Sequence, residues 1–158
     1  MFAKLVSLKD AAYLLDIDDS TELEAAIRAG HLKAAESGRK GMKFKVGDLT
    51  IFKLAQVIAH TGVELDKAVR YAEAILGTRM PEDYRDIVEW IENEKQELFC
   101  FIADAQLSRI FLRNKEDAKE LDVGAVKPVL LPTTRCEINV FRVIRPVIYR
   151  ARQLLARK

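Results

Sequence analysis

The chain has 158 residues, enough for one ordinary domain or two small ones. Hydrophobic residues make up 49% and charged residues 32%, which excludes a disordered chain and indicates a globular one. Because the net charge is only +2, overall charge does not indicate nucleic-acid binding, and its local distribution has to be considered. No apolar run approaches the roughly 20 residues of a membrane helix, and the N-terminus does not resemble a secretory signal. We therefore expect a cytoplasmic protein with no membrane partner.

Cysteine and histidine are scarce, with only Cys100, Cys136, His31 and His60. The cysteines form no Cys-x-x-Cys pair, so we expect buried free thiols, with a disulfide as the alternative. Neither histidine has neighbours at metal-ligand spacing, so no metal site is predicted. The sequence has no recognisable catalytic triad, phosphate-binding glycine loop or catalytic pair of carboxylates. We therefore predict neither an enzyme nor a cofactor.

Two short helices are predicted first. Ser7 is a candidate N-cap for the first, whose apolar positions are Ala11, Ala12, Leu14 and Leu15. The acidic segment 16–19 indicates a turn. Asp19 or Ser20 caps the second helix, and Gly30 ends it. Its inward-facing stripe is formed by Leu23, Ala26 and Ile27.

A hairpin and two longer helices follow. Residues 31–34 and 42–46 are candidate strands, and apolar and basic side chains alternate along the second. The segment 36–41 contains two glycines and a serine, which favours a hairpin tip, or wing. Asp48 is a candidate cap for a third helix over residues 49–61. The 3.6-residue apolar period predicts a fourth helix over residues 65–76.

Pro81 is well suited to open a fifth helix, so residues 77–81 are the best candidate domain boundary. Apolar runs at 98–103 and 107–112 then predict a hairpin that turns at 104–106. The polar segment 114–122 is expected to hold a helical turn. Two further strands are expected, and Pro146 is expected to open a last helix. The strands cover 126–131 and 136–141, and the helix carries Val147, Ile148, Ala151, Leu154 and Leu155.

Four segments of the first half of the chain stand out by their order and spacing: VSLKDAAYLL at 6–15, IRAGHL at 27–32, KFKVGDL at 43–49 and TGVELDKA at 61–68. Through these segments, about residues 5–77 resemble the DNA-binding domain of MerR-like transcription regulators. Excisionase-type winged helices share the first three segments, and the second helix pair favours the MerR-like branch. We therefore expect an α+β fold. Residues 1–78 would form a winged helix-turn-helix, and residues 79–158 a small antiparallel-sheet-plus-helices domain for dimerisation or sensing.

The resemblance implies that the second helix enters the major groove of double-stranded DNA and that the wing contacts phosphates or the minor groove. It also implies a homodimer. Residues 33–45 carry a net charge of +4, which suits phosphate contacts. The alternative is a solvated loop without a partner. The predicted DNA-binding residues are Ser20, Thr21, Arg28, Lys33, Arg39, Lys40, Lys43 and Lys45.

Several of these residues have a second interpretation. Ser20 and Thr21 could donate to a phosphate at a helix start or act only as N-caps. Arg28 could contact DNA or pair with Glu24 one helical turn earlier. Residues 135–158 carry a net charge of +6, which suits DNA, an acidic partner or a membrane surface, or else an ordinary packed helix.

The leading hypothesis is a sequence-specific DNA-binding transcription regulator, with a possible protein partner for its C-terminal domain. The alternative is a winged-helix adaptor that binds a protein in place of DNA, since Glu22 and Glu24 lie on the expected recognition helix. A third hypothesis is an excisionase-like architectural role that bends DNA.

Overall fold

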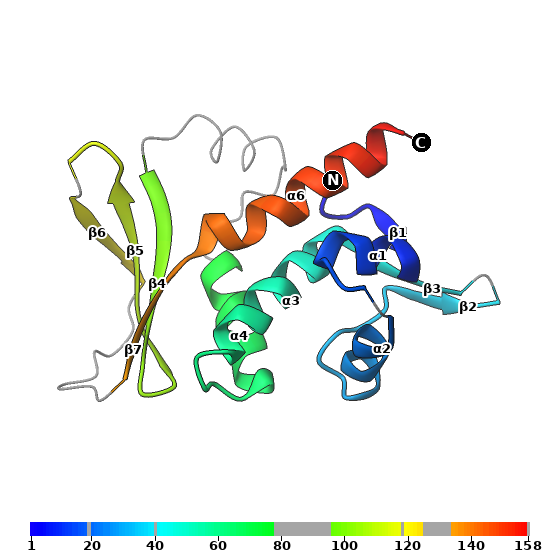
Figure 1. Cartoon of the computed structure of the whole chain (residues 1–158), viewed down its shortest axis with the longest axis horizontal. Helices are drawn as coiled ribbons and strands as arrows, with labels where there is room; N and C mark the ends of the chain where they lie inside the picture. The colour runs from blue at the N-terminus through cyan, green and yellow to red at the C-terminus, as the bar shows by residue number, and fades with distance from the viewer. Residues whose placement is uncertain (19, 40, 78–95, 118, 125–133, 158) are drawn as a thin grey trace. The chain divides into compact units, whose positions relative to one another are not determined.

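The computed structural model describes residues 1–18, 20–39, 41–77, 96–117, 119–124 and 134–157. These residues form five helices and seven strands in two antiparallel sheets, which confirms the α+β class (Figure 1). The chain divides into two compact units: residues 1–53 with 144–158 form unit 1, and residues 54–143 form unit 2. The domain boundary predicted after residue 78, and the helix predicted after Pro81, lie outside the described residues and stay predictions.

Unit 1 begins with the two predicted helices, α1 (Leu8–Leu15) and α2 (Ser20–Arg28). The Ser7 hydroxyl accepts a hydrogen bond from the Asp10 amide at 3.1 Å, which confirms the predicted N-cap. Asp16 ends α1 in the left-handed conformation at φ 63°, and Gly30 adopts φ +81° just after α2. Leu23 and Ala26 turn into the core.

Unit 1 also contains a three-stranded antiparallel sheet with strand order β1-β3-β2. Its strands are β1 (Leu5–Ser7), β2 (Glu36–Gly38) and β3 (Gly41–Lys45). Val6 lies opposite Phe44, and both side chains are buried. The strand predicted at 31–34 was wrong. The amides of His31 and Leu32 both donate to the Ala26 carbonyl at the end of α2, so they are not available to a strand ladder.

The helix α3 (Val46–Ala59) begins three residues earlier than predicted, so Asp48 lies in its first turn and does not cap it. The N-terminal segment supplies the cap instead. The Val46 amide donates to the Lys4 carbonyl and the Gly47 amide to the Phe2 carbonyl, each at 3.1 Å. A Cβ at Gly47 would lie 3.3 Å from the Phe2 Cβ, so glycine permits this close approach. The helix α4 (Leu65–Gly77) matches its prediction.

Unit 2 contains a four-stranded sheet with strand order β6-β5-β4-β7. The predicted hairpin is confirmed as β4 (Gln96–Ala103) and β5 (Gln106–Asn114). Asp104 and Ala105 form its turn with positive φ angles of 47° and 57°, the geometry that matches the twist of a tight hairpin. The remaining strands are β6 (Glu120–Gly124) and β7 (Arg135–Asn139).

Three predictions in this half of the chain need correction. The segment 114–122, predicted to hold a helical turn, contains a turn at residues 115–117 and enters β6 at Glu120, which pairs across the ladder with Arg113. The strand predicted at 136–141 ends at Asn139, whose side-chain oxygen accepts from the Arg142 amide and caps α6 (Val140–Ala156). Pro146 therefore lies inside the last helix and does not open it. The strand predicted at 126–131 falls outside the described ranges.

The two units have apolar interiors of ordinary composition. In unit 2, Leu98, Cys100 and Ile102 alternate along β4 and are buried. The part of α6 that belongs to unit 1, from Ile144 on, buries an apolar stripe formed by Ile144, Val147, Ile148 and Ala151. None of the helices in the described ranges combines the length and apolarity that a membrane-spanning segment requires.

Candidate nucleic-acid interface

The last printed pair of the β2–β3 hairpin of unit 1 joins Gly38 to Gly41. Gly41 takes φ +91°, which favours glycine. Arg39 is exposed directly after Gly38. Lys40, also predicted to contact DNA, lies outside the described residues. The hairpin therefore presents Arg39 at the end of its strand pair.

Side chains alternate along β3 as the sequence indicates. Phe44 is buried, so Lys43 and Lys45 lie on the opposite face of the sheet. Lys45 is exposed opposite Leu5. Lys43 lies opposite Glu36, and its Nζ is 2.8 Å from a Glu36 carboxylate oxygen. This exposed ion pair offsets part of the positive charge of the hairpin. It was not predictable from the sequence, because it depends on the register of β2 against β3.

The predicted residues outside the hairpin fall at three places in unit 1. Ser20 is half-buried and Thr21 exposed in the first turn of α2, whereas Arg28 is exposed at the last residue of the same helix. At 1.5 Å per residue, the two ends of α2 are about 12 Å apart. Lys33 is exposed in the segment that leads into β2. The structure thus gathers Arg39, Lys43 and Lys45 on one hairpin and separates Ser20 and Thr21 from Arg28.

Acidic side chains share the surface of α2 and of the turn before it. Glu22 and Glu24 are exposed on α2, and Asp18 is exposed in the turn. A cavity of about 570 Å³ runs along α1 into this turn and is lined by Lys9, Tyr13, Asp16 and Asp18 among others. The first turn of α2 therefore offers the hydroxyl groups of Ser20 and Thr21 and backbone amides as donors, but acidic side chains lie around it. The hairpin, in contrast, offers cations.

Arg150 of α6 joins the end of α1 and was missed by sequence reasoning. Its Nη2 lies 2.6 Å from an Asp16 carboxylate oxygen, its Nη1 donates to the Leu14 carbonyl at 3.5 Å, and its guanidinium lies 5.8 Å from the centroid of the Tyr13 ring. These contacts fix the second half of α6 against α1. No local pattern signals a pair separated by 134 residues.

One face of the unit 2 sheet carries a network of charges, which we call the charged face: Arg109, Arg113, Glu120 and Glu137. The Arg113 guanidinium donates to both oxygens of Glu137 at 2.8 Å and to Glu120 at 2.7 Å. Hydrogen bonds to Glu137 and Glu120 raise the pKa of Arg113 above its ordinary value, and the bond from Arg113 lowers that of Glu120. The two arginines and the two glutamates therefore pair with one another.

The ring of Phe99 stacks on that of Phe111 beneath this network, with centroids 5.4 Å apart. The Arg113 guanidinium lies 4.4 Å from the Phe99 centroid and covers it. A cavity of about 430 Å³ beside these residues is lined by Lys115 and Arg142 together with Glu97 and others. Arg113 is already engaged by two carboxylates, and Glu97 offsets part of the charge of the other two cations in the lining.

Both cysteines are free, as predicted. Cys100 on β4 is buried, and Cys136 on β7 is half-buried. Cys136 pairs with Ile102, so the two cysteines are diagonal neighbours on adjacent strands. Burial, with a smaller contribution from Cys136, raises the pKa of the Cys100 thiol to about 12, so it is a poor nucleophile at neutral pH. Within the described ranges, no three His, Cys, Asp or Glu side chains gather as a metal site would need.

Comparison with known proteins adds no relative to this picture. No protein-family model matches the chain, and no curated protein matches it. The arrangement of helices, hairpin and charges in unit 1 is therefore what indicates a function.

Proposed function

We propose that unit 1 is a winged helix-turn-helix that binds double-stranded DNA, with β2–β3 as the wing and α2 as the recognition helix. The order β1-α1-α2-β2-β3 and the pairing of β1 with β3 support this assignment, because they attach a short basic hairpin directly to a pair of helices joined by a tight turn. The observation that carries the proposal is the exposed cationic hairpin with Arg39 at its tip.

The wing would supply most of the affinity. Arg39 and Lys45 are exposed and would contact phosphates, with Lys33 alongside them. Lys43 would contribute less, since it shares its charge with Glu36. Phosphate contacts of this kind position a protein on the duplex and are independent of sequence.

The first turn of α2 would approach the duplex through Ser20 and Thr21, where the helix N-terminus favours a phosphate. Arg28 is the remaining exposed cation on α2 that could contact the duplex. Sequence-specific control of transcription, dimerisation or sensing by the C-terminal part, and a cytoplasmic location belong to the same proposal.

The test compares binding to a labelled mixed-sequence duplex over a salt series. Replacing both Arg39 and Lys45 by Ala should weaken binding at low salt and reduce the slope of log K against log salt by about 2, because two phosphate contacts are lost. Arg70→Ala is the matched control, since Arg70 is exposed on α4 in unit 2, and its slope should equal that of wild type.

The same assay separates a second candidate, an adaptor that binds protein through the acidic surface of α2. Glu22 and Glu24 are exposed there, next to Asp18, and this observation favours it. If α2 contacts DNA, replacing both glutamates by Gln removes repulsion and tightens binding severalfold at low salt. Folded wild-type protein that does not bind duplex DNA even at low salt would reject the DNA proposal in favour of the adaptor.

A further inference from the structure

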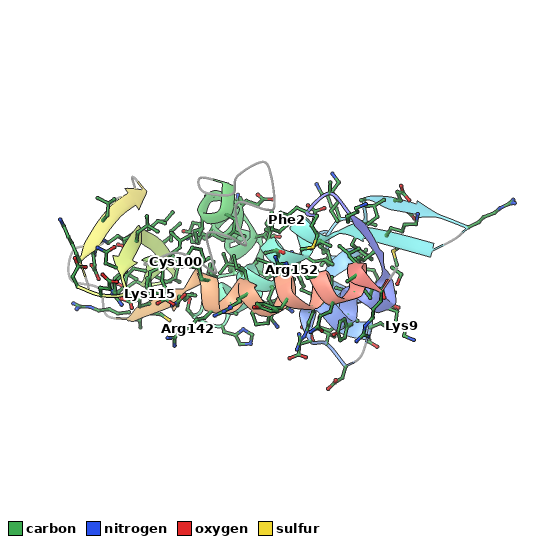
Figure 2. All side chains as sticks on the ribbon, turned by 90° about the horizontal axis from the view of Figure 1, so that it is seen from above. Phe2, Lys9, Cys100, Lys115, Arg142 and Arg152 are labelled. Carbon is green, nitrogen blue, oxygen red and sulfur yellow. The ribbon has the colours of Figure 1, made fainter. Side chains whose placement is uncertain are left out.

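The part of α6 that belongs to unit 1 presents a basic surface that the proposed DNA interface does not use. Arg145, Tyr149 and Arg152 are exposed at positions i, i+4 and i+7 of this helix, which share one side, and we call them the arginine face (Figure 2, where Arg152 is labelled). Residues 138–158 contain neither Asp nor Glu, so this stretch of the chain contributes only positive charge.

A membrane surface does not suit this face. A helix that lies in a lipid interface needs a free apolar side, and the apolar side of α6 is already occupied by the protein interior. Ile144, Val147, Ile148 and Ala151 are each 2% exposed or less. The partner must therefore be recognised by charge and by what the exposed side offers.

Tyr149 lies among these arginines and is 43% exposed. The Arg145 guanidinium lies 5.7 Å from the centroid of its ring. Tyrosine and arginine together are enriched at protein interfaces and among their energetically dominant residues. A duplex backbone, in contrast, offers phosphates and sugars and gives an exposed ring little to pack against.

The helix that carries the arginine face is also held in place. Arg150 fixes α6 to α1 through Asp16 and Leu14. In the view of Figure 1, α6 and α2 lie on opposite sides of α1. Such a fixed helix loses little conformational entropy on binding.

We propose that the arginine face of α6 docks an acidic segment of a partner protein. Carboxylates of the segment pair with Arg145 and Arg152, and an apolar side chain packs on Tyr149. Arginine binds carboxylates through two parallel hydrogen bonds, which add geometric specificity to the attraction between the charges. The inference goes beyond DNA binding and does not depend on it.

The test uses a labelled peptide of roughly 20 residues in which Asp and Glu alternate with Leu and Phe. Replacing both Arg145 and Arg152 by Gln should weaken its binding to the full chain at least about tenfold, and Tyr149→Ala should weaken it severalfold. Replacing both Arg39 and Lys45 by Gln is the matched control: it removes two exposed charges from the hairpin and should change peptide affinity less than about twofold. Thermal unfolding checks that each variant is folded.

Duplex DNA is measured with the same proteins. The α6 variant should keep its DNA affinity within about twofold, whatever that affinity is. Peptide binding that is equal in the α6 variant and wild type, or no peptide binding at all, would overturn the proposal. A loss of DNA affinity in the α6 variant as large as its loss of peptide affinity would assign the face to nucleic acid. If wild type binds peptide through α6 but binds no DNA, the proposed function fails while this inference stands.

Discussion

At the scale of single residues, the charged face of unit 2 makes stability depend on pH. Arg113 and Arg109 lower the pKa of Glu120 in the folded protein below its unfolded value of roughly 4.3. The stabilisation is therefore fully present above that pH and is lost as pH falls through the folded value. Because Glu120 retains 30% of its side-chain exposure, its contribution is small, about 1 kcal/mol at most.

We therefore expect Glu120→Gln to lower the free energy of unfolding at pH 7 by up to about 1 kcal/mol, and to have a smaller effect as pH falls through the folded pKa of Glu120. Urea denaturation over a series of acidic and neutral pH values measures this difference. Glu73→Gln, on the exposed side of α4, controls for the loss of a carboxylate outside the network. An equal difference at every pH would show that the pairing does not depend on the ionised carboxylate.

Among single residues, exposure was predictable from the sequence and pairing was not. The apolar Phe44 indicated that its neighbours Lys43 and Lys45 share one face of a strand. It did not indicate that Glu36 would lie opposite Lys43, since that depends on the register of β2 against β3. The ion pair between Arg150 and Asp16 depends on the whole fold.

At the scale of elements, apolar periodicity predicted α1, α2, α4, β4 and β5, each of which buries a regular set of side chains. Short strands were missed, because β1 and β2 have three residues each and β2 is exposed throughout. The starts of α3 and α6 were misplaced. Backbone carbonyls of residues 2–4 cap α3, and the Asn139 side chain caps α6. Both helices therefore begin before the residues at which the apolar pattern becomes clear.

Pro146 gives a prediction at this scale. It has no N–H to donate to the Arg142 carbonyl, and a proline inside a helix costs up to about 3 kcal/mol relative to alanine. Because proline also restricts the unfolded chain, we expect Pro146→Ala to raise the free energy of unfolding by about 2 kcal/mol. Urea denaturation tests this, with Gln153→Ala on the same exposed side of α6 as the control. An unchanged or lower free energy of unfolding would contradict it.

At the scale of the whole molecule, composition and element types predicted the α+β class correctly, but the grouping of segments was not predictable. Residues 144–158 belong to the same compact unit as residues 1–53, and no local pattern marks such a return of the chain. The same difference between local patterns and features of the whole fold applies to the predicted DNA-binding residues. The hairpin cations follow from a local pattern, whereas the setting of α2 among acidic side chains depends on the turn and on α1.

The central claim is that unit 1 contacts duplex DNA through the hairpin and the first turn of α2. Amide chemical-shift mapping of the full isotope-labelled chain, titrated with a mixed-sequence duplex at low salt, tests it most directly. We expect the largest shifts at Gly38, Arg39 and Gly41, with a second group at Ser20 and Thr21, and no shifts along β4 to β7. Shifts confined to the unit 2 sheet or to α6, or no shifts from a folded protein at low salt, would contradict the claim.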